Sequence, residues 1–145
     1  PHLLKVKGSV VGVSSVAGFQ GLPGRTGYSS SKFAMHGFLE TLRVEHLKQG
    51  LHVMIAAPGF TSTNVRKVAL GPDGQAQGES PRNESKMMTP EEVAKIMVRG
   101  IRTRRRMIVM TIQGKLTVLL KKLMPALLDR LTYRMMAREP DSPFK

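Results

Sequence analysis

The chain has 145 residues, enough for one ordinary domain, and a formal net charge of +13 at neutral pH. It holds no cysteine, which excludes disulfides and thiolate metal sites, and its four histidines lack the spacing of a zinc site. No apolar run reaches the roughly 18 residues that a membrane-spanning helix needs.

The first predicted element is a buried strand over residues 9–14, which is apolar and β-branched, as is typical of a central parallel strand. The residues before it resemble the end of a helix. Ser14 and Ser15 close the strand, and a loop punctuated by glycine and proline follows over residues 18–27.

A long helix is predicted over residues 28–49, where apolar residues recur at helical spacing and Gly50 provides a C-terminal stop. We expect Gly37 to lie where this helix packs closely against a strand or another helix. His36 and His46 are expected on the helix surface rather than at a metal site.

A second buried strand is predicted over residues 51–57, and it ends at Pro58-Gly59. The helix between the two strands forms the crossover of a βαβ unit. Both strands therefore deliver their motifs at their C-terminal ends, where ligands bind in open α/β sheets.

The remaining chain is predicted as a loop, a helix, a strand and a helical pair. Residues 60–88 are polar and glycine-rich, which indicates a lid or binding loop. Thr89 suits an N-cap and Pro90 the first helical position. A short strand is expected over residues 107–111, and apolar-basic helices over 115–136 with a kink or a new start at Pro125.

The positive charge is concentrated near the C-terminus. Residues 95–145 hold 13 Lys and Arg against 3 Asp and Glu, and Arg102–Arg106 contains four arginines. Such a stretch indicates an anionic membrane surface, an acidic ligand or a solvated face. No aromatic residue accompanies the arginine run, which gives little support to single-stranded nucleic acid binding, and nucleic acid is not an expected partner.

The most informative pattern is Tyr28-Ser29-Ser30-Ser31-Lys32, with Ser15 thirteen residues before the tyrosine. A tyrosine and a lysine at positions i and i+4 share one face of a helix. The ammonium favours the phenolate form of a phenol whose ordinary pKa is about 10. A serine hydroxyl beside them can hold a carbonyl oxygen, which gives a proton donor or acceptor for a carbonyl or alcohol.

Residues 8–59, together with the Pro58-Gly59-Phe60-Thr61-Ser62-Thr63 element, resemble the catalytic part of the short-chain dehydrogenase/reductase (SDR) family. The family's strand-end serine matches Ser15, with Ser14 as the alternative, and its Tyr-x-x-x-Lys matches Tyr28 and Lys32. The resemblance implies the fold class, α/β with a Rossmann-like doubly wound parallel sheet. Only the C-terminal portion of that fold is expected, as residues 1–145 of a single NAD(P)-binding domain.

The resemblance also implies roles for individual residues. Tyr28 is the general acid or base, Lys32 stabilises the phenolate and binds the nicotinamide ribose, and Ser15 orients the substrate oxygen. Further cofactor contacts are expected at the second strand's end, and Phe19 and Leu22 are expected to flank the substrate. The expected cofactor-binding residues are Tyr28, Lys32, Pro58, Gly59, Phe60 and Thr63.

The implied cofactor is NAD(P)H, with NADP slightly preferred and the type left open. The implied partner is a carbonyl or alcohol substrate of apolar, lipid-like character. The family's glycine-rich turn and its catalytic asparagine have no match here, so we expect an N-terminally truncated fragment that is inactive alone. We also expect its first strand to have an unpaired edge.

Other features of the protein remain expectations. A homo-oligomer is implied for the full-length form, and a cytoplasmic protein with peripheral membrane contact is expected. Two alternatives stay open: a non-catalytic SDR-like interaction protein, and a protein that binds anionic membranes through its basic C-terminal segments.

Overall fold

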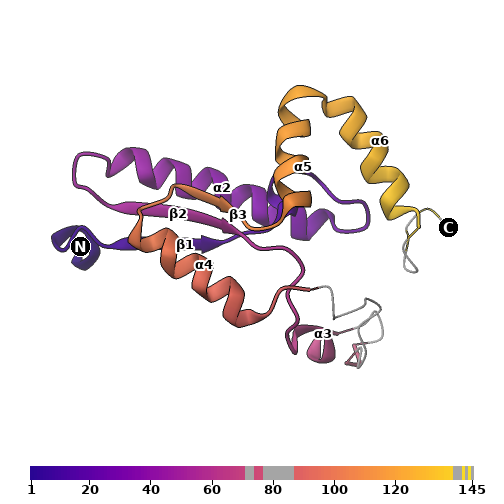
Figure 1. The fold of residues 1–145 in the computed structure, drawn as a ribbon, viewed down its shortest axis with the longest axis horizontal. Coiled ribbons are helices and arrows are strands. Elements are labelled where there is room, and N and C mark those ends of the chain that lie inside the picture. Colours follow the sequence, from indigo (N-terminus) through magenta and orange to yellow (C-terminus); the bar gives the residue numbers. More distant parts are fainter. Residues whose placement is uncertain (71–73, 77–86, 139–141, 143, 145) are drawn as a thin grey trace.

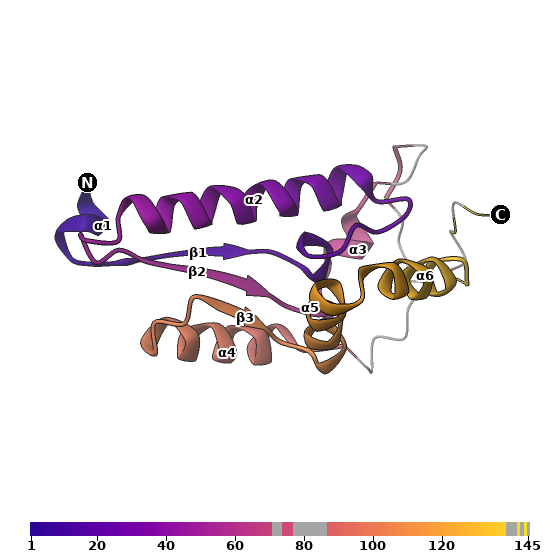
Figure 2. The ribbon, with the colours of Figure 1, turned by 90° about the horizontal axis from the view of Figure 1, so that it is seen from above.

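The computed structural model describes residues 1–70, 74–76, 87–138, 142 and 144. Within them, a parallel sheet runs in the order β1 (Ser9–Val13), β2 (His52–Ala57) and β3 (Met107–Val109). Helix α2 (Thr26–Glu45) covers one face of the sheet and α4 (Pro90–Arg102) covers the other (Figure 2). The predicted α/β fold with a doubly wound parallel sheet is confirmed.

The centre of the core is β2, whose six residues are all buried. Val53, Met54 and Ile55 are fully buried, and each apolar side chain of this size contributes about 1.5–3 kcal/mol on burial. Leu39 of α2 packs against this strand together with Leu51. The continuous apolar run of the sequence thus forms a strand covered on both faces, as parallel sheets require.

Strand β1 lies at an edge of the sheet formed by the described residues, because its one strand partner there is β2. None of its residues is fully buried, and Val13 is 46% exposed. The expected unpaired edge is therefore present. Gly12 lets α2 approach closely, since a Cβ there would lie 2.2 Å from Cδ1 of Leu39.

Helix α2 differs from the prediction in its bounds and in its buried face. It spans residues 26–45 instead of 28–49, and a turn leads to Gly50, whose φ of +73° suits glycine. Gly37 meets no neighbouring atom of its own chain, so the expected close packing does not occur within the chain, and packing against a second copy stays a prediction. The expected surface position of His36 is also wrong, because its side chain is buried.

The amino-terminal ends of the strands are joined by arginine side chains. Buried Arg43 donates from Nε to the Val53 carbonyl and from Nη2 to the Arg106 carbonyl, at 3.1 and 3.2 Å. Arg104 donates to the carbonyls of Lys7 and Gly50. Part of the arginine run therefore joins backbone segments instead of offering a free basic patch.

Helix α4 begins as predicted. The Thr89 hydroxyl accepts from the Glu92 N–H, and the Glu92 carboxylate accepts from the Thr89 N–H, which forms a capping box with Pro90 in the first turn. Strand β3 ends at residue 109 instead of 111. The short elements of the chain are α1 (His2–Lys5), the 3-10 helix η1 (Val16–Gly18) and α3 (Val65–Val68).

The C-terminal helices α5 (Ile112–Leu123) and α6 (Pro125–Met136) form a pair beyond the carboxyl end of the sheet (Figure 1). Helix α5 starts earlier than predicted because the Thr111 hydroxyl accepts from the Gly114 N–H and caps it. Pro125 starts a second helix, one of the two outcomes expected. Of the predicted loop over 60–88, residues 71–73 and 77–86 lie outside the described residues.

Candidate active site

The two serines that end β1 have different surroundings. The Ser14 side chain is buried, and its Oγ lies 2.6 Å from Nε2 of His36. Ser15 is partly exposed, and its Oγ accepts a 3.2 Å hydrogen bond from the Ala17 N–H at the start of η1. Of the two serines, Ser15 is therefore the one whose hydroxyl is open to a reacting group.

Tyr28 and Lys32 lie one turn apart at the beginning of α2. The Tyr28 side chain is 48% exposed, and Nζ of Lys32 lies 5.5 Å from the centroid of its ring. Nζ also donates a 3.1 Å hydrogen bond to the carbonyl of Val13, two residues before Ser15. The structure thus joins the lysine of the pair to the strand end that carries the serine.

Sequence reasoning missed His36, which follows Tyr28 and Lys32 at the same spacing of four. Besides its bond to Ser14, its ring meets the Phe19 ring edge-on, with centroids 4.6 Å apart. Burial lowers the pKa of His36 below its ordinary value of about 6.5, against a smaller opposite effect of Glu40. The interval of four residues between Tyr28, Lys32 and His36 could have indicated this position, because residues at that spacing share one helix face.

The two residues expected to flank the substrate lie in the segment between η1 and α2. Phe19 is partly buried against His36. Leu22 is also partly buried, and its N–H donates a 3.2 Å hydrogen bond to Oγ of Ser29. Both therefore help to join this segment to α2, and their contact with a substrate stays a prediction.

The predicted cofactor segment follows β2, so it lies at the same end of the sheet as Ser15. Packing within the chain explains the glycine at position 59, because a Cβ there would lie 2.4 Å from Cγ2 of Thr111. Phe60 is 47% exposed, and its carbonyl accepts from the Met88 N–H at 2.9 Å. Thr63 is exposed, and its Oγ1 accepts from the Val65 N–H at 3.4 Å.

Pro58 is partly buried between β2 and this segment. The expected cofactor-binding residues thus form two groups, one at the start of α2 and one after β2. Both groups lie at the carboxyl ends of parallel strands, which is where the sequence predicted a ligand.

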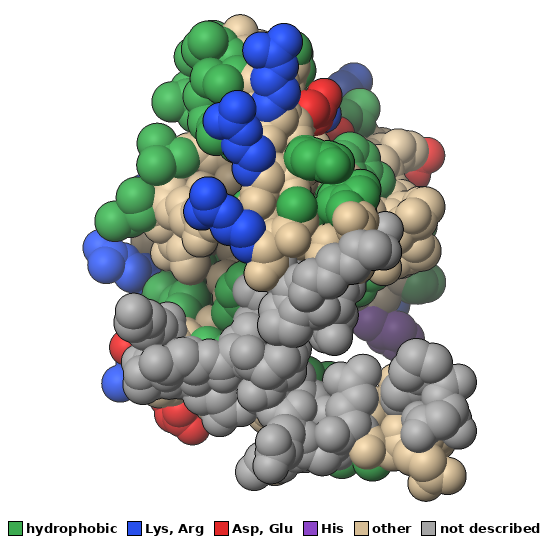
Figure 3. Space-filling view, turned by 90° about the vertical axis from the view of Figure 1, so that its right-hand side faces the viewer, with side chains coloured by type: hydrophobic (Ala, Val, Ile, Leu, Met, Phe, Trp, Pro, Cys, Tyr) green, Lys and Arg blue, Asp and Glu red, His purple; other side chains and the backbone are tan. Residues whose placement is uncertain are grey.

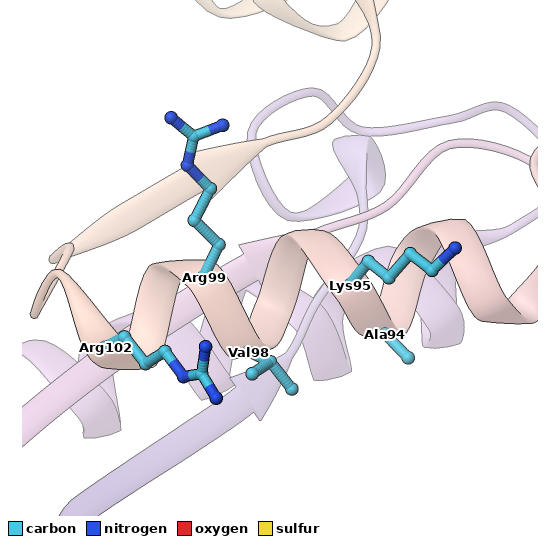
Figure 4. A pocket seen from close by; sticks show the side chains of 5 residues that line it. All are labelled: Ala94, Lys95, Val98, Arg99 and Arg102. Carbon is cyan, nitrogen blue, oxygen red and sulfur yellow. The ribbon is translucent and has the colours of Figure 1, made fainter.

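Other parts of the described chain offer weaker sites. An open hollow on α4 is lined by Ala94, Lys95, Val98, Arg99 and Arg102, and Figure 4 shows its cationic side chains spreading apart instead of converging. Among the described residues, no group of three His, Cys, Asp or Glu side chains could hold a metal ion. No helix in the described part of the chain is long and apolar enough to cross a membrane.

Comparison with known proteins adds to this geometry. Residues 1–71 match the family model for short chain dehydrogenases. The chain belongs to the short-chain dehydrogenase/reductase family. It is 36% identical over 129 residues to dehydrogenase/reductase SDR family member 7B of Xenopus laevis, covering 88% of this chain and 40% of the relative.

A second SDR relative, the family protein 7-like of Drosophila melanogaster, is 32% identical over 121 residues, covering 83% of this chain and 37% of the relative. The chain therefore spans about 40% of the length of the curated SDR relatives it matches first.

Solved SDR structures show the same fold. A short-chain dehydrogenase from Streptomyces avermitilis superposes with a TM-score of 0.65 at 21% identity, covering 97% of this chain and 55% of that chain. An SDR enzyme from Sphingobium yanoikuyae, solved in complex with NADPH, gives a TM-score of 0.61 at 18% identity, covering 89% and 48%.

Proposed function

We propose that this SDR protein is an NAD(P)-dependent oxidoreductase that interconverts a carbonyl and an alcohol. One observation carries the proposal: Lys32, one turn from Tyr28 on α2, bonds the carbonyl of Val13 at the strand end that leads into Ser15. A cation, a phenol and a hydroxyl thus come from two adjoining elements at the carboxyl end of a parallel sheet.

The three side chains divide the chemistry between them. The Ser15 hydroxyl holds and polarises the substrate oxygen, because it is the open serine of the two. Tyr28 donates a proton to that oxygen in reduction and accepts one in oxidation. The Lys32 ammonium stabilises the phenolate form that remains after proton donation. A bound nicotinamide supplies or accepts the hydride.

The charges near the site suit an anionic dinucleotide. Between Gly8 and Thr63 the acidic residues are Glu40 and Glu45, both in the second half of α2, away from its start. The groups available at the start of α2 and after β2 include an ammonium, a phenol and the Thr63 hydroxyl, which can pair with ribose hydroxyls and phosphates. In the proposal, Lys32 and Tyr28 hold the ribose, and Pro58, Gly59, Phe60 and Thr63 lie against the nicotinamide.

The cofactor type and the substrate belong to the proposal as well. The NADPH complex of the Sphingobium relative favours a nicotinamide cofactor, and we retain NADP as the slightly preferred form. Exposed Phe60 and partly buried Leu22 and Phe19 favour an apolar carbonyl compound over a charged one. Because the chain spans about 40% of its first relatives, this activity is proposed for the whole protein that contains it.

The test compares the two tyrosines of the sequence in the intact protein. Tyr28→Phe removes the proposed acid and should reduce NAD(P)H-dependent reduction of apolar ketones and aldehydes by roughly 100-fold or more. Tyr133→Phe is the matched control, since Tyr133 lies on α6 against Phe144 and should change turnover little. Equal rates for the wild-type protein and Tyr28→Phe would refute the catalytic assignment.

A second candidate function, binding to anionic membrane surfaces, is favoured by the pattern of α5 and α6. On α5, four exposed apolar residues recur at i, i+4, i+7 and i+11, which places them in one stripe. They are between 51% and 77% exposed, and Lys115 and Lys122 border the stripe. The stripe residues are Ile112, Leu116, Leu119 and Leu123.

Helix α6 repeats this arrangement with Leu127, Leu131 and Met135 beside Arg130 and Arg134. Figure 3 shows a row of Lys and Arg side chains with hydrophobic side chains on both sides, at the top of the view. Exposed apolar residues bordered by cations favour the interface of an anionic bilayer, where each cation near the surface is worth about 1 kcal/mol.

Vesicle co-sedimentation tests this candidate. The protein should bind vesicles that contain phosphatidylserine more strongly than pure phosphatidylcholine vesicles. Leu116→Ser with Leu123→Ser should weaken binding to both kinds, and Lys115→Gln with Lys122→Gln should weaken only the first. Phe38→Ser is the control, because Phe38 is 65% exposed on α2 and far along the chain from this pair. Binding that none of these changes reduces would exclude the α5–α6 surface.

A further inference from the structure

Ser14, the residue immediately before the candidate serine, forms a buried pair with His36. The Ser14 Oγ and His36 Nε2 atoms are 2.6 Å apart, and both side chains are less than a tenth exposed. A hydrogen bond shielded from water in this way is stronger than an exposed one, and losing one partner leaves the other polar group buried alone.

The surrounding residues enclose this pair tightly. A Cβ on Gly18 would lie 2.7 Å from both His36 Nε2 and Ser14 Oγ, so the backbone of η1 closes directly over them. The edge of the Phe19 ring packs on the imidazole, with ring centroids 4.6 Å apart. The 3-10 helix, the strand end and α2 therefore meet at these two side chains.

The pair is connected to Ser15 through the backbone. The Ser14 N–H donates to the Ala56 carbonyl at 2.7 Å, so Ser14 continues the pairing of β1 with β2. Ser15 follows in extended conformation and caps η1 by accepting from the Ala17 N–H. The orientation of the Ser15 hydroxyl thus depends on where Ser14 is held.

We propose that His36 is a positioning residue for the candidate serine: its bond to Ser14 fixes the turn from β1 into η1 on which the Ser15 hydroxyl is presented. The catalytic part of this inference rests on the proposed function, in which Ser15 holds the substrate oxygen. Tyr28, Lys32 and His36 follow one another at intervals of four on α2. The same helix therefore positions the phenol and the ammonium directly, and the Ser15 hydroxyl through His36.

The charged neighbours of His36 lie on its own helix, Lys32 one turn before it and Glu40 one turn after it. The elements packed against the ring, β1 and η1, carry no ionisable side chain. The imidazole therefore acts in its neutral form near neutral pH, as one partner in a bond with the Ser14 hydroxyl.

The decisive experiment measures amide hydrogen exchange at Ala17, whose N–H bonds Ser15, in the intact protein. His36→Leu and Ser14→Ala should each speed exchange at Ala17 by roughly 10-fold relative to Ile55, a core amide that bonds the Arg106 carbonyl. His36→Gln keeps a polar group near the position of Nε2 and should leave the ratio close to that of the wild-type protein.

Kinetics supply the second readout. His36→Leu and Ser14→Ala should each lower kcat by roughly 10-fold with little change in KM, and the double variant should be no worse than either, because both remove one interaction. His36→Gln should restore most of kcat, which a purely space-filling role of the ring would not predict.

An Ala17-to-Ile55 exchange ratio that stays at the wild-type value in both variants would overturn the proposal. Should His36→Leu fail to fold, Ser14→Ala decides alone, since it removes a single oxygen atom. A wild-type protein with no carbonyl reductase activity would refute the proposed function, and the exchange ratio would still decide whether His36 positions Ser15.

Discussion

The Lys32 ammonium donates a 3.1 Å hydrogen bond to the carbonyl of Val13, which joins α2 to the last residue of β1. The lysine therefore does more than share a helix face with Tyr28. It ties the helix that carries the phenol to the strand that leads into Ser15, so the spacing between the two motifs is fixed by a direct contact.

Replacing Lys32 should impair turnover far more than it impairs folding. Lys32→Met removes both the bond to Val13 and the cation beside Tyr28, and we expect carbonyl reduction to fall by about 100-fold or more. Lys48→Met, an exposed lysine after α2, serves as the control. Steady-state kinetics with circular dichroism would check this, and activity within twofold of the wild-type protein would contradict it.

His36 should make stability depend on pH. Burial lowers the pKa of His36 in the folded protein, so between that lowered value and its ordinary value of about 6.5 the unfolded chain binds more protons. Its stabilising contribution is therefore complete above about pH 6.5 and is lost as the pH falls towards the lowered pKa. Thermal melts between about pH 7 and pH 5 should show a steeper loss for the wild-type protein than for His36→Gln. Parallel curves of melting temperature against pH for the two proteins would contradict a lowered pKa of His36.

Arg43 should be important for stability because its buried guanidinium serves two backbone carbonyls. Its burial, the nearby Arg106 and a smaller opposite effect of Glu40 leave the pKa of Arg43 lowered, yet the group stays charged near neutral pH. Arg43→Met leaves the Val53 and Arg106 carbonyls without this donor and should cost about 2–4 kcal/mol of unfolding free energy.

Urea denaturation would measure that loss. Arg99→Met, an exposed arginine on α4, should change stability by no more than about 0.5 kcal/mol. Arg43→Lys should recover only part of the loss, because an ammonium lacks the planar fork that reaches both carbonyls. A full recovery with lysine would show that charge alone is needed at this position.

Alanine substitutions at Gly12 of β1 and Gly37 of α2 should change the stability of the protein in opposite directions. Gly12→Ala forces a methyl group against Leu39 and should cost about 1–3 kcal/mol. Gly37→Ala meets no neighbouring atom and should stabilise α2 by about 0.5–1 kcal/mol, since alanine favours helix. Denaturation and light scattering of both variants would check this. A loss of stability together with a lower mass for Gly37→Ala would instead place Gly37 between two copies of the chain.

Much of the fold could be predicted because the local signals agreed with the tertiary structure. The apolar run before Pro58 became the buried central strand, and Thr89-Pro90 became a capped helix start. Helix α2 was less predictable, because its N-cap residue, Arg25, makes no side-chain capping bond and its apolar residues point both ways. Phe38 is 65% exposed while Leu39 is 3% exposed, so periodicity alone did not identify the inner face.

The candidate site could be predicted only in part, for a similar reason. Spacing named Tyr28, Lys32 and Ser15, whose positions follow from one strand and one helix. The sequence already favoured Ser15 over Ser14, but it could not show that the Ser14 hydroxyl is buried in a bond with His36 while Ser15 is partly exposed. Gly59 was predicted for a ligand, yet its nearest neighbour is Thr111, which lies more than fifty positions later in the sequence.

The rigid register of Tyr28, Lys32 and His36 on α2 has a consequence for how this sequence can change length. Each residue advances a helix by about 1.5 Å and turns it by about 100°. A single insertion between positions 28 and 36 would therefore swing the phenol away from the strand end that His36 holds. Substitutions on the outer face of this segment are tolerable, but insertions and deletions are not, so homologous proteins that share the chemistry must keep its length.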